Sequence, residues 1–270
     1  MSNKIHLLII DPQKDFCDPK GSLFVPGAVE DMSRLASFIT RVGKKIDKYH
    51  VTLDSHHYND LAHPQFWVNT KDGSHPAAFQ TISVSDVEDS VYIPAESSYY
   101  DRMLNYVKEL RSHNRYPLTI WPPHCLTGSE GQAVVPELFD ALRLQTASRN
   151  IYINWVTKGS NPLTEHYSAV KAEVPDPKDP STDINTDLIN TLQKADTIVL
   201  AGEALNFCVK NTLLDVISAF GNDKYLSKFV MLTDATSPVP IPGYEKQVSD
   251  MMNDLVHRGM KTSTTVDFLT

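Results

Sequence analysis

Cysteine is scarce in this chain. Its 270 residues include only Cys17, Cys125 and Cys208. Three cysteines so far apart in the sequence exclude a disulfide framework. Free thiols are typical of proteins in a reducing compartment, so we expect a cytoplasmic protein.

Positive charge and long apolar runs are also scarce. Lys and Arg number 25 against 33 Asp and Glu, a formal net charge of -8, which argues against a general nucleic-acid binder. No apolar stretch approaches the about 20 residues of a membrane-spanning helix, so we expect no membrane partner. The short run "IHLLII" at 5–10 lacks a small-residue cleavage site after it and predicts a first strand rather than a signal peptide.

Strand patterns and helix patterns alternate along the chain. This alternation predicts an α/β protein with three layers, α/β/α, around a mainly parallel central sheet. The expected strands are 5–10, 50–54, 150–156, 196–202 and 228–235, with weaker candidates at 118–121 and 261–266. The expected helices are 27–46, 97–113, 133–144, 183–195, 206–221 and 243–259.

One long stretch has no clear period. Residues 55–96 contain Pro, Asn, Asp and aromatic residues without helical or strand spacing. We therefore expect a single domain, 1–270, with an irregular insertion at about 57–98. A loop of this length inside a compact domain is more often a lid or a pocket wall than a neutral connector.

Reactive side chains follow the expected strands. Parallel sheets bind ligands beyond the carboxyl ends of their strands, where Asp11, Asp54, Lys158, Asp234 and the turn from Gly202 to Cys208 are expected. A helix N-terminus or a nearby lysine lowers the pKa of a thiol, which would make Cys208 a nucleophile. The alternatives are a buried core cysteine at 208, a solvated lysine at 158 and a turn-capping aspartate at 11.

Histidines gather in two segments. "DSHHYNDLAH" contains Asp54, His56, His57 and His63, and "WPPHC" contains His124. An Asp-x-His pair at a strand end places both side chains on one side, and oxygen with imidazole nitrogen suits Zn, Fe or Mn. The alternative is an ordinary polar surface loop. We expect surface or structural roles for the remaining histidines: His6, His50, His75, His113, His166 and His257.

Five segments together resemble the isochorismatase-like cysteine hydrolases, in particular their nicotinamidase-like branch. They are "IIDPQKDF", "LDSHHYNDLAH", "WPPHC", "VTKGSNPLTEHYSA" and "GEALNFCV", in this order along the chain. Each motif is weak alone, but their order and their expected places at strand ends make the resemblance specific, and it covers most of the chain.

The resemblance implies roles for several residues. Asp11, Lys158 and Cys208 would be catalytic, and the backbone N–H groups of Ala204 and Cys208 would form the oxyanion hole. The peptide between Glu203 and Ala204 would be cis. Two aromatic residues would sandwich a flat substrate ring: Phe16 and Trp121.

The resemblance also implies a divalent metal and a reaction. Asp54, His56 and His124 would hold the ion with waters, zinc being the first choice and iron or manganese the alternatives. The reaction would be hydrolysis of a small carboxamide through a thioester, with nicotinamide giving nicotinate and ammonia.

Two features depart from the family pattern. His63 lies seven residues after His56, so either His63 or water completes the metal shell, with His57 as an alternative ligand. The segment 66–98 is long and could reshape the pocket for another amide. Two alternative functions remain. One is a metal-free relative that cleaves a different bond, and the other is a non-catalytic ligand-binding relative. The expected partner is a small carboxamide, and the sequence leaves assembly into a homo-oligomer open.

Overall fold

A parallel sheet forms the centre of the molecule. The computed structural model describes residues 3–114, 116–241 and 245–270. Six strands lie in the order β10-β9-β8-β1-β2-β7, and every neighbouring pair is parallel. Their bounds are β1 Ile5–Ile10, β2 Lys48–Asp54, β7 Asn154–Lys158, β8 Thr197–Gly202, β9 Phe229–Leu232 and β10 Lys261–Ser263. The expected mainly parallel sheet is confirmed.

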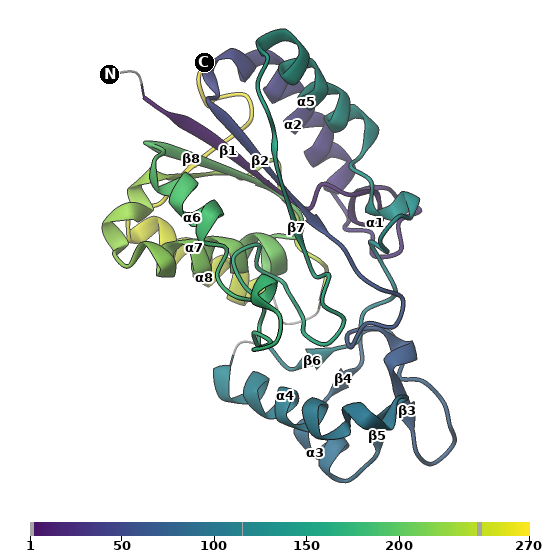
Figure 1. The fold of residues 1–270 in the computed structure, drawn as a ribbon. Helices are drawn as coiled ribbons and strands as arrows, with labels where there is room; N and C mark the ends of the chain where they lie inside the picture. Colours follow the sequence, from purple (N-terminus) through teal and green to yellow (C-terminus); the bar gives the residue numbers. More distant parts are fainter. Residues whose placement is uncertain (1–2, 115, 242–244) are drawn as a thin grey trace.

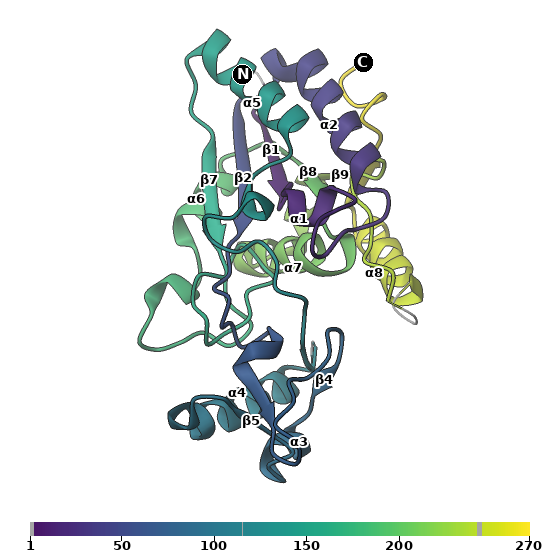
Figure 2. The same cartoon turned by 90° about the vertical axis from the view of Figure 1, so that its right-hand side faces the viewer.

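Helices cover both faces of this sheet (Figures 1 and 2). Helices α2 and α5 lie together on one face, and α6, α7 and α8 lie on the other. Their bounds are α2 Ala28–Val42, α5 Pro136–Arg149, α6 Thr186–Gln193, α7 Lys210–Phe220 and α8 Glu245–His257, and a short helix, α1 Lys14–Cys17, follows β1. The central strand β1 is buried along its whole length, which explains its unbroken apolar run.

Several boundaries differ from those expected. The third strand is Asn154–Lys158 rather than 150–156, so Lys158 is the last residue of β7 and does not follow it. The segment at 118–121 contributes only β6, Leu118–Thr119, and β6 pairs with β4 outside the central sheet. Element ends are where local patterns carry least information.

The stretch expected to be irregular contains short regular elements. They are β3 Trp67–Asn69, β4 Thr81–Ile82, α3 Val84–Glu88 and β5 Tyr92–Pro94. Together with α4 Tyr100–His113 and β6 they share a second hydrophobic core, which includes Trp67, Val87 and Met103. We call residues 61–114 and 116–120 the small lobe. Figure 1 shows it below the end of β2. Elements of two to five residues are too short to produce a period, which is why the sequence pattern missed them.

Candidate active site

The amine of Lys158 lies at the centre of a buried group of charges. Its Nζ is 3.0 Å from Oδ2 of Asp11, 3.0 Å from Oδ1 of Asp54 and 3.5 Å from Sγ of Cys208. All four side chains are buried. Three residues expected to be catalytic, separated by up to 197 positions (208 − 11), are therefore in contact at the carboxyl end of the sheet.

Asp11 is held by its neighbour on β2. Its N–H donates to Oγ1 of Thr52 over 3.0 Å, and the Thr52 hydroxyl donates to Oδ1 of Asp11 over 2.5 Å. Asp11 also has a φ of 43°, a left-handed conformation that is uncommon for residues other than glycine. These contacts fix one carboxylate oxygen and leave the other facing Lys158.

Gln13 connects the ends of β1 and β2. Its Nε2 donates to the Asp54 carbonyl and its Oε1 accepts from the Asp54 N–H, both over 2.7 Å. The side chain thus acts like an extra pair of strand hydrogen bonds beyond β1. It sets the distance between Asp11 and Asp54, the two carboxylates that share Lys158.

The segment after β8 presents Cys208. The Glu203–Ala204 peptide is cis, as the family resemblance implies. Leu205–Val209 then forms a π-helical turn, and α7 begins only at Lys210. Cys208 therefore lies in a wide turn before the regular helix rather than at its first residue. Such turns are frequent at functional sites.

Burial governs the ionisation of the nucleophile candidate. It raises the pKa of the Cys208 thiol well above its usual range, although Lys158 opposes the shift. Lys158 therefore lowers this pKa as expected, but burial outweighs it, and the expected net lowering is wrong for the resting site. Burial also raises the pKa of Asp11, against the opposing charge of Lys158. Burial alone would lower the pKa of Lys158, but Asp11 and Asp54 outweigh it and raise that pKa well above its usual value.

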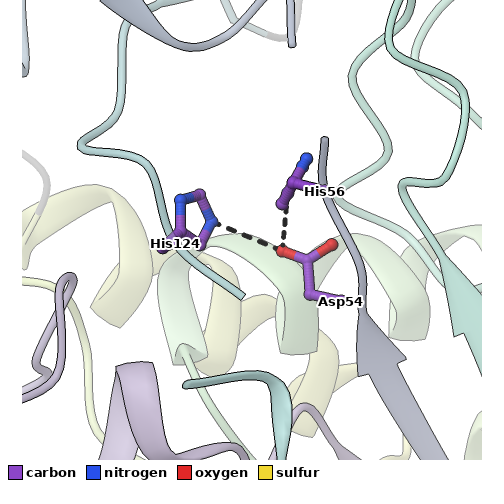
Figure 3. Close-up of side chains that lie close together, drawn as sticks. All are labelled: Asp54, His56 and His124. Atoms are coloured by element: carbon purple, nitrogen blue, oxygen red, sulfur yellow. Dashed lines mark hydrogen bonds and ion pairs between the residues drawn. The ribbon is translucent and has the colours of Figure 1, made fainter. Parts of the chain in front are cut away.

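A second group of side chains adjoins Lys158. Oδ2 of Asp54 is 3.1 Å from Nε2 of His56 and 3.5 Å from Nε2 of His124. Figure 3 shows both imidazoles directed at this one carboxylate oxygen. The three residues offer ligand atoms within 4.8 Å of one another, so they are spaced to hold a metal ion.

The outer nitrogens of these histidines are already engaged. Nδ1 of His56 is 3.0 Å from Oδ2 of Asp60, and Nδ1 of His124 is 2.8 Å from the Pro122 carbonyl. A carbonyl oxygen only accepts, so Nδ1 of His124 carries a proton, and Nε2 is the nitrogen through which the neutral ring would bind a metal. Acceptors behind the imidazoles are the usual outer shell of a metal site, and the donor set therefore fits a divalent cation.

His63 lies next to this cluster but is not one of its three members, so His63 as a ligand stays a prediction. Nδ1 of His63 is 3.1 Å from the His57 carbonyl, while its buried Nε2 has no hydrogen-bond partner among the described residues. The His63 ring lies 5.2 Å from the His56 ring and 5.5 Å from the His124 ring, centre to centre. Burial lowers the pKa of His63 to about 4. His57 is exposed and offers only its carbonyl, so it is not a ligand candidate.

A narrow pocket opens beside Cys208. Phe16 and Trp121 both line it, as expected, and Ala204 borders it from the cis peptide. Nε1 of Trp121 donates to the Tyr167 hydroxyl over 3.1 Å, which fixes the indole. The remaining lining residues are Leu23, Asp54, His124, Glu165, Tyr167, Phe207 and Val239.

Sequence reasoning missed Thr52, Glu165 and Tyr167. Burial raises the pKa of Glu165 to about 7, and its Oε2 has no hydrogen-bond partner in the described parts of the chain. Glu165 and Tyr167 belong to a segment without regular structure, so nothing in the pattern shows which of its side chains face the pocket. The strand-end candidate Asp234 instead accepts hydrogen bonds from the N–H and hydroxyl of Thr265 and lies outside the site.

Two curated proteins resemble this chain in sequence, and no family model matches it. The nicotinamidase of Saccharomyces cerevisiae is 26% identical over 235 residues, 86% of this chain and 88% of that protein. The nicotinamidase of Escherichia coli is 33% identical over 103 residues, 37% of this chain and 41% of that protein.

Solved structures share the fold over nearly the whole chain. The yeast nicotinamidase bound to the inhibitor nicotinaldehyde has a TM-score of 0.64 at 19% identity, covering 96% of this chain and 99% of that one. A pyrazinamidase of Pyrococcus horikoshii in complex with zinc has a TM-score of 0.57 at 17% identity, covering 97% and 99%. An isochorismatase-like hydrolase from Alkaliphilus metalliredigens has a TM-score of 0.55 at 18% identity, covering 98% and 97%.

Proposed function

We propose that this chain, which has the fold of the isochorismatase-like hydrolases and resembles their nicotinamidase branch in sequence, is a nicotinamidase. It is a hydrolase that cleaves the C–N bond of a linear amide and converts nicotinamide and water to nicotinate and ammonia. The observation that carries the proposal is the contact of Lys158 with Asp11, Asp54 and Cys208, directly beside the histidine cluster.

Asp11 is the general base in this proposal. Because the pKa of Cys208 is raised, the resting side chain is a neutral thiol that needs a base before it attacks. Ligand atoms of Asp11 and Cys208 lie within 4.8 Å of each other. Asp11 takes the thiol proton, the thiolate attacks the carboxamide carbon, and Lys158 balances the negative charge on both groups.

In the next steps Asp11 changes from a base to an acid and back. The N–H groups of Ala204 and Cys208 donate to the oxyanion of the tetrahedral intermediate. Asp11 returns its proton to the leaving nitrogen, the C–N bond breaks, and ammonia departs from a thioester. Water then adds to the thioester carbon with Asp11 accepting its proton. The C–S bond breaks, Asp11 returns that proton to the Cys208 sulfur, and the acid product loses its own proton to ammonia and leaves as nicotinate.

The pocket and the histidine cluster suit a flat heteroaromatic ring. Phe16 and Trp121 supply apolar walls, and Asp54, His56 and His124 would hold a divalent cation, with His63 or water as a further ligand. Such a cation supplies Lewis-acid polarisation of a ring nitrogen. Zinc is our first choice, in line with the zinc-bound pyrazinamidase neighbour, and iron or manganese are the alternatives. We also propose a cytoplasmic location, which three widely spaced cysteines support.

Ammonia release from a panel of amides tests the function. We expect nicotinamide and pyrazinamide to be hydrolysed, unrelated aliphatic carboxamides to be poor substrates, and a chelator to abolish turnover until metal is restored. Preference for an aliphatic amide, or full activity in chelator with no metal by elemental analysis, would contradict the proposal.

Replacement of single cysteines tests the mechanism. Cys208→Ala should lower kcat by at least about 10⁴-fold without unfolding the protein, because no other group forms the thioester. Cys17→Ala is the matched control, since Cys17 is also buried but does not line the pocket, and it should keep most of the activity. Wild-type ammonia release by Cys208→Ala would rule out this nucleophile.

A further inference from the structure

A larger cavity lies outside the catalytic pocket. Its volume is about 610 Å³, and it shares Leu23, Phe207 and Val239 with the pocket that contains Cys208. Because the same side chains border both spaces, the outer cavity adjoins the catalytic pocket. A volume of this size lies within the range of small-molecule sites.

Parts of the chain that are far apart in the sequence build this outer cavity, in addition to Phe207 from the turn after β8. Phe24 comes from the loop that follows α1, Phe79 comes from the small lobe, and Ile241 comes from the loop that follows β9. The small lobe therefore supplies a wall of the cavity, which gives the long segment after β2 a place in the binding site.

The chemistry of the walls excludes a charged ligand. Among the described residues that line the cavity, none carries an ionisable side chain, and the polar members are Ser22, Thr81 and Thr119. The other lining residues are apolar or aromatic, and Pro122 extends the surface next to Trp121. A site of this kind binds apolar groups by removing their surface from water.

Phe79 is held in an unusual way at this cavity. It has a φ of 67°, its side chain is 54% exposed, and it is not part of the core of the small lobe. Its N–H donates to the Ile120 carbonyl over 2.5 Å, and its ring meets Trp121 edge-on at 5.9 Å. A large aromatic residue kept exposed at a strained backbone position, in contact with the pocket wall, points to binding rather than to stability.

We propose that this cavity is an outer subsite for an apolar substituent on the ring of the substrate carboxamide. The inference rests on the proposed amidohydrolase function and extends its substrate class. The enzyme accepts alkyl- or aryl-substituted aromatic carboxamides as well as nicotinamide: the carboxamide lies at Cys208 and the substituent lies between Phe79 and Ile241.

The test compares nicotinamide with its phenyl derivatives substituted at each of the four free ring carbons. At least one derivative should have a kcat/KM about tenfold above that of nicotinamide, through a lower KM, because the phenyl group is buried in the outer cavity. The preference ratio is kcat/KM for the derivative divided by kcat/KM for nicotinamide. Phe79→Ala should reduce this ratio several-fold, and so should Ile241→Ala, which changes a different loop. Phe139→Ala changes a 46%-exposed phenylalanine on α5, outside the cavity, and should leave the ratio unchanged.

The outcomes separate the subsite from the basic activity. If the wild type hydrolyses nicotinamide but every derivative has a lower kcat/KM, the subsite is wrong and the hydrolase remains. A preferred derivative whose ratio is unchanged in both folded variants also overturns the subsite. If no compound is hydrolysed, calorimetric binding to Cys208→Ala decides, and a phenyl derivative that binds no tighter than nicotinamide overturns the proposal.

Discussion

At the residue scale, Lys158 contacts three of the reactive side chains of the site: Asp11, Asp54 and Cys208. Its ammonium group is buried with two carboxylates and a thiol, so its charge is the nearest compensation for Asp11 and Asp54. A lysine suits this position because its compact ammonium group has three donors that can be shared between partners. Removing one partner from a buried ion pair leaves an uncompensated charge, which costs far more than the net stability of the pair.

Lys158→Met should therefore damage both stability and activity. We expect the free energy of unfolding to fall by about 3–5 kcal/mol and kcat to fall by at least about 10³-fold, because buried Asp11 loses its counter-charge and buried Asp54 loses one of two, the other being His56. Urea unfolding and ammonia release measure the two effects. The matched control is Lys246→Met, which removes an exposed lysine from its ion pair with Asp250 and should cost less than about 1 kcal/mol. Near-wild-type stability of Lys158→Met would contradict this account.

Sequence reasoning reached the charged residues of the site but not their environment. Asp11, Asp54 and Lys158 could be predicted because parallel strands end at one edge of a sheet. The contact between Thr52 and Asp11 could not, since it depends on the register between β1 and β2. The pKa of Cys208 could not be predicted either. The sequence shows its neighbours in the chain but not the depth of its burial, which determines the net shift.

At the scale of elements, the close packing of β8 against β1 positions the turn that carries Cys208. Gly202, the last residue of β8, has a φ of 114°. A Cβ added there would lie 2.0 Å from the Ile10 carbonyl oxygen and 2.5 Å from the Ile10 nitrogen. Both contacts are with backbone, which cannot rotate away as a side chain would. The glycine therefore allows β1 and the nucleophile turn to approach each other.

Gly202→Ala should disrupt this approach. We expect a loss of about 3 kcal/mol or more in the free energy of unfolding, and loss of activity in any protein that folds, because both backbone strain and a steric clash oppose the alanine. Gly221→Ala is the control: Gly221 ends α7 with a φ of 69°, but nothing lies within 4 Å of an added Cβ. It should cost only about 1 kcal/mol. Equal losses in the two variants would show that the close contact with Ile10 has no energetic effect.

The predicted and missed elements differ in length. The strands and helices of the central layers have five or more residues in most cases and were recognisable from their spacing. In the small lobe the 14-residue helix α4 was predicted, but the short elements between Trp67 and Pro94 were not, since β4 has two residues and α3 has five. These short elements are stabilised by a shared core around Trp67 and Met103. That core forms from residues far apart in the sequence.

At the scale of the whole molecule, the site lies at the carboxyl end of the central sheet, next to the small lobe. Asp11, Lys158 and Cys208 come from the central sheet, whereas Trp121 and His124 come from the segment that leaves the small lobe. The single-domain description remains a prediction. The hydrophobic residues that line the pocket, Trp121 included, belong to the core of the central sheet, and the small lobe contributes His63, whose ring lies 5.2 Å from that of His56. Loss of packing in the small lobe would therefore disturb the histidine cluster through His63.

The central sheet also contains a polar pair away from the site. His6 on β1 and His50 on β2 are buried, and Nε2 of His50 lies 3.2 Å from Nδ1 of His6. The amide of Asn154 donates to Nδ1 of His50 over 3.0 Å, so His50 donates its one proton to His6 and both rings are neutral. Burial lowers the pKa of His6 to about 4 and that of His50 to about 3. The nearby charges are two of each sign: Lys4, Lys48, Asp47 and Asp196.

This pair should make the stability of the protein sensitive to acid. Histidines in the unfolded chain bind protons near pH 6.5, whereas the folded pair does not bind them until about pH 4 or below. The stabilisation is complete above about pH 6.5 and is lost as the pH falls through this window, because the unfolded state then holds more protons. We compare the wild type with the double variant His6→Leu, His50→Leu by urea titration. Between pH 7 and 4.5 the wild type should lose roughly 5 kcal/mol more unfolding free energy than the double variant. His257→Gln, an exposed change on α8, should keep the wild-type slope. If the double variant also keeps that slope, the pair is not the source of the acid sensitivity.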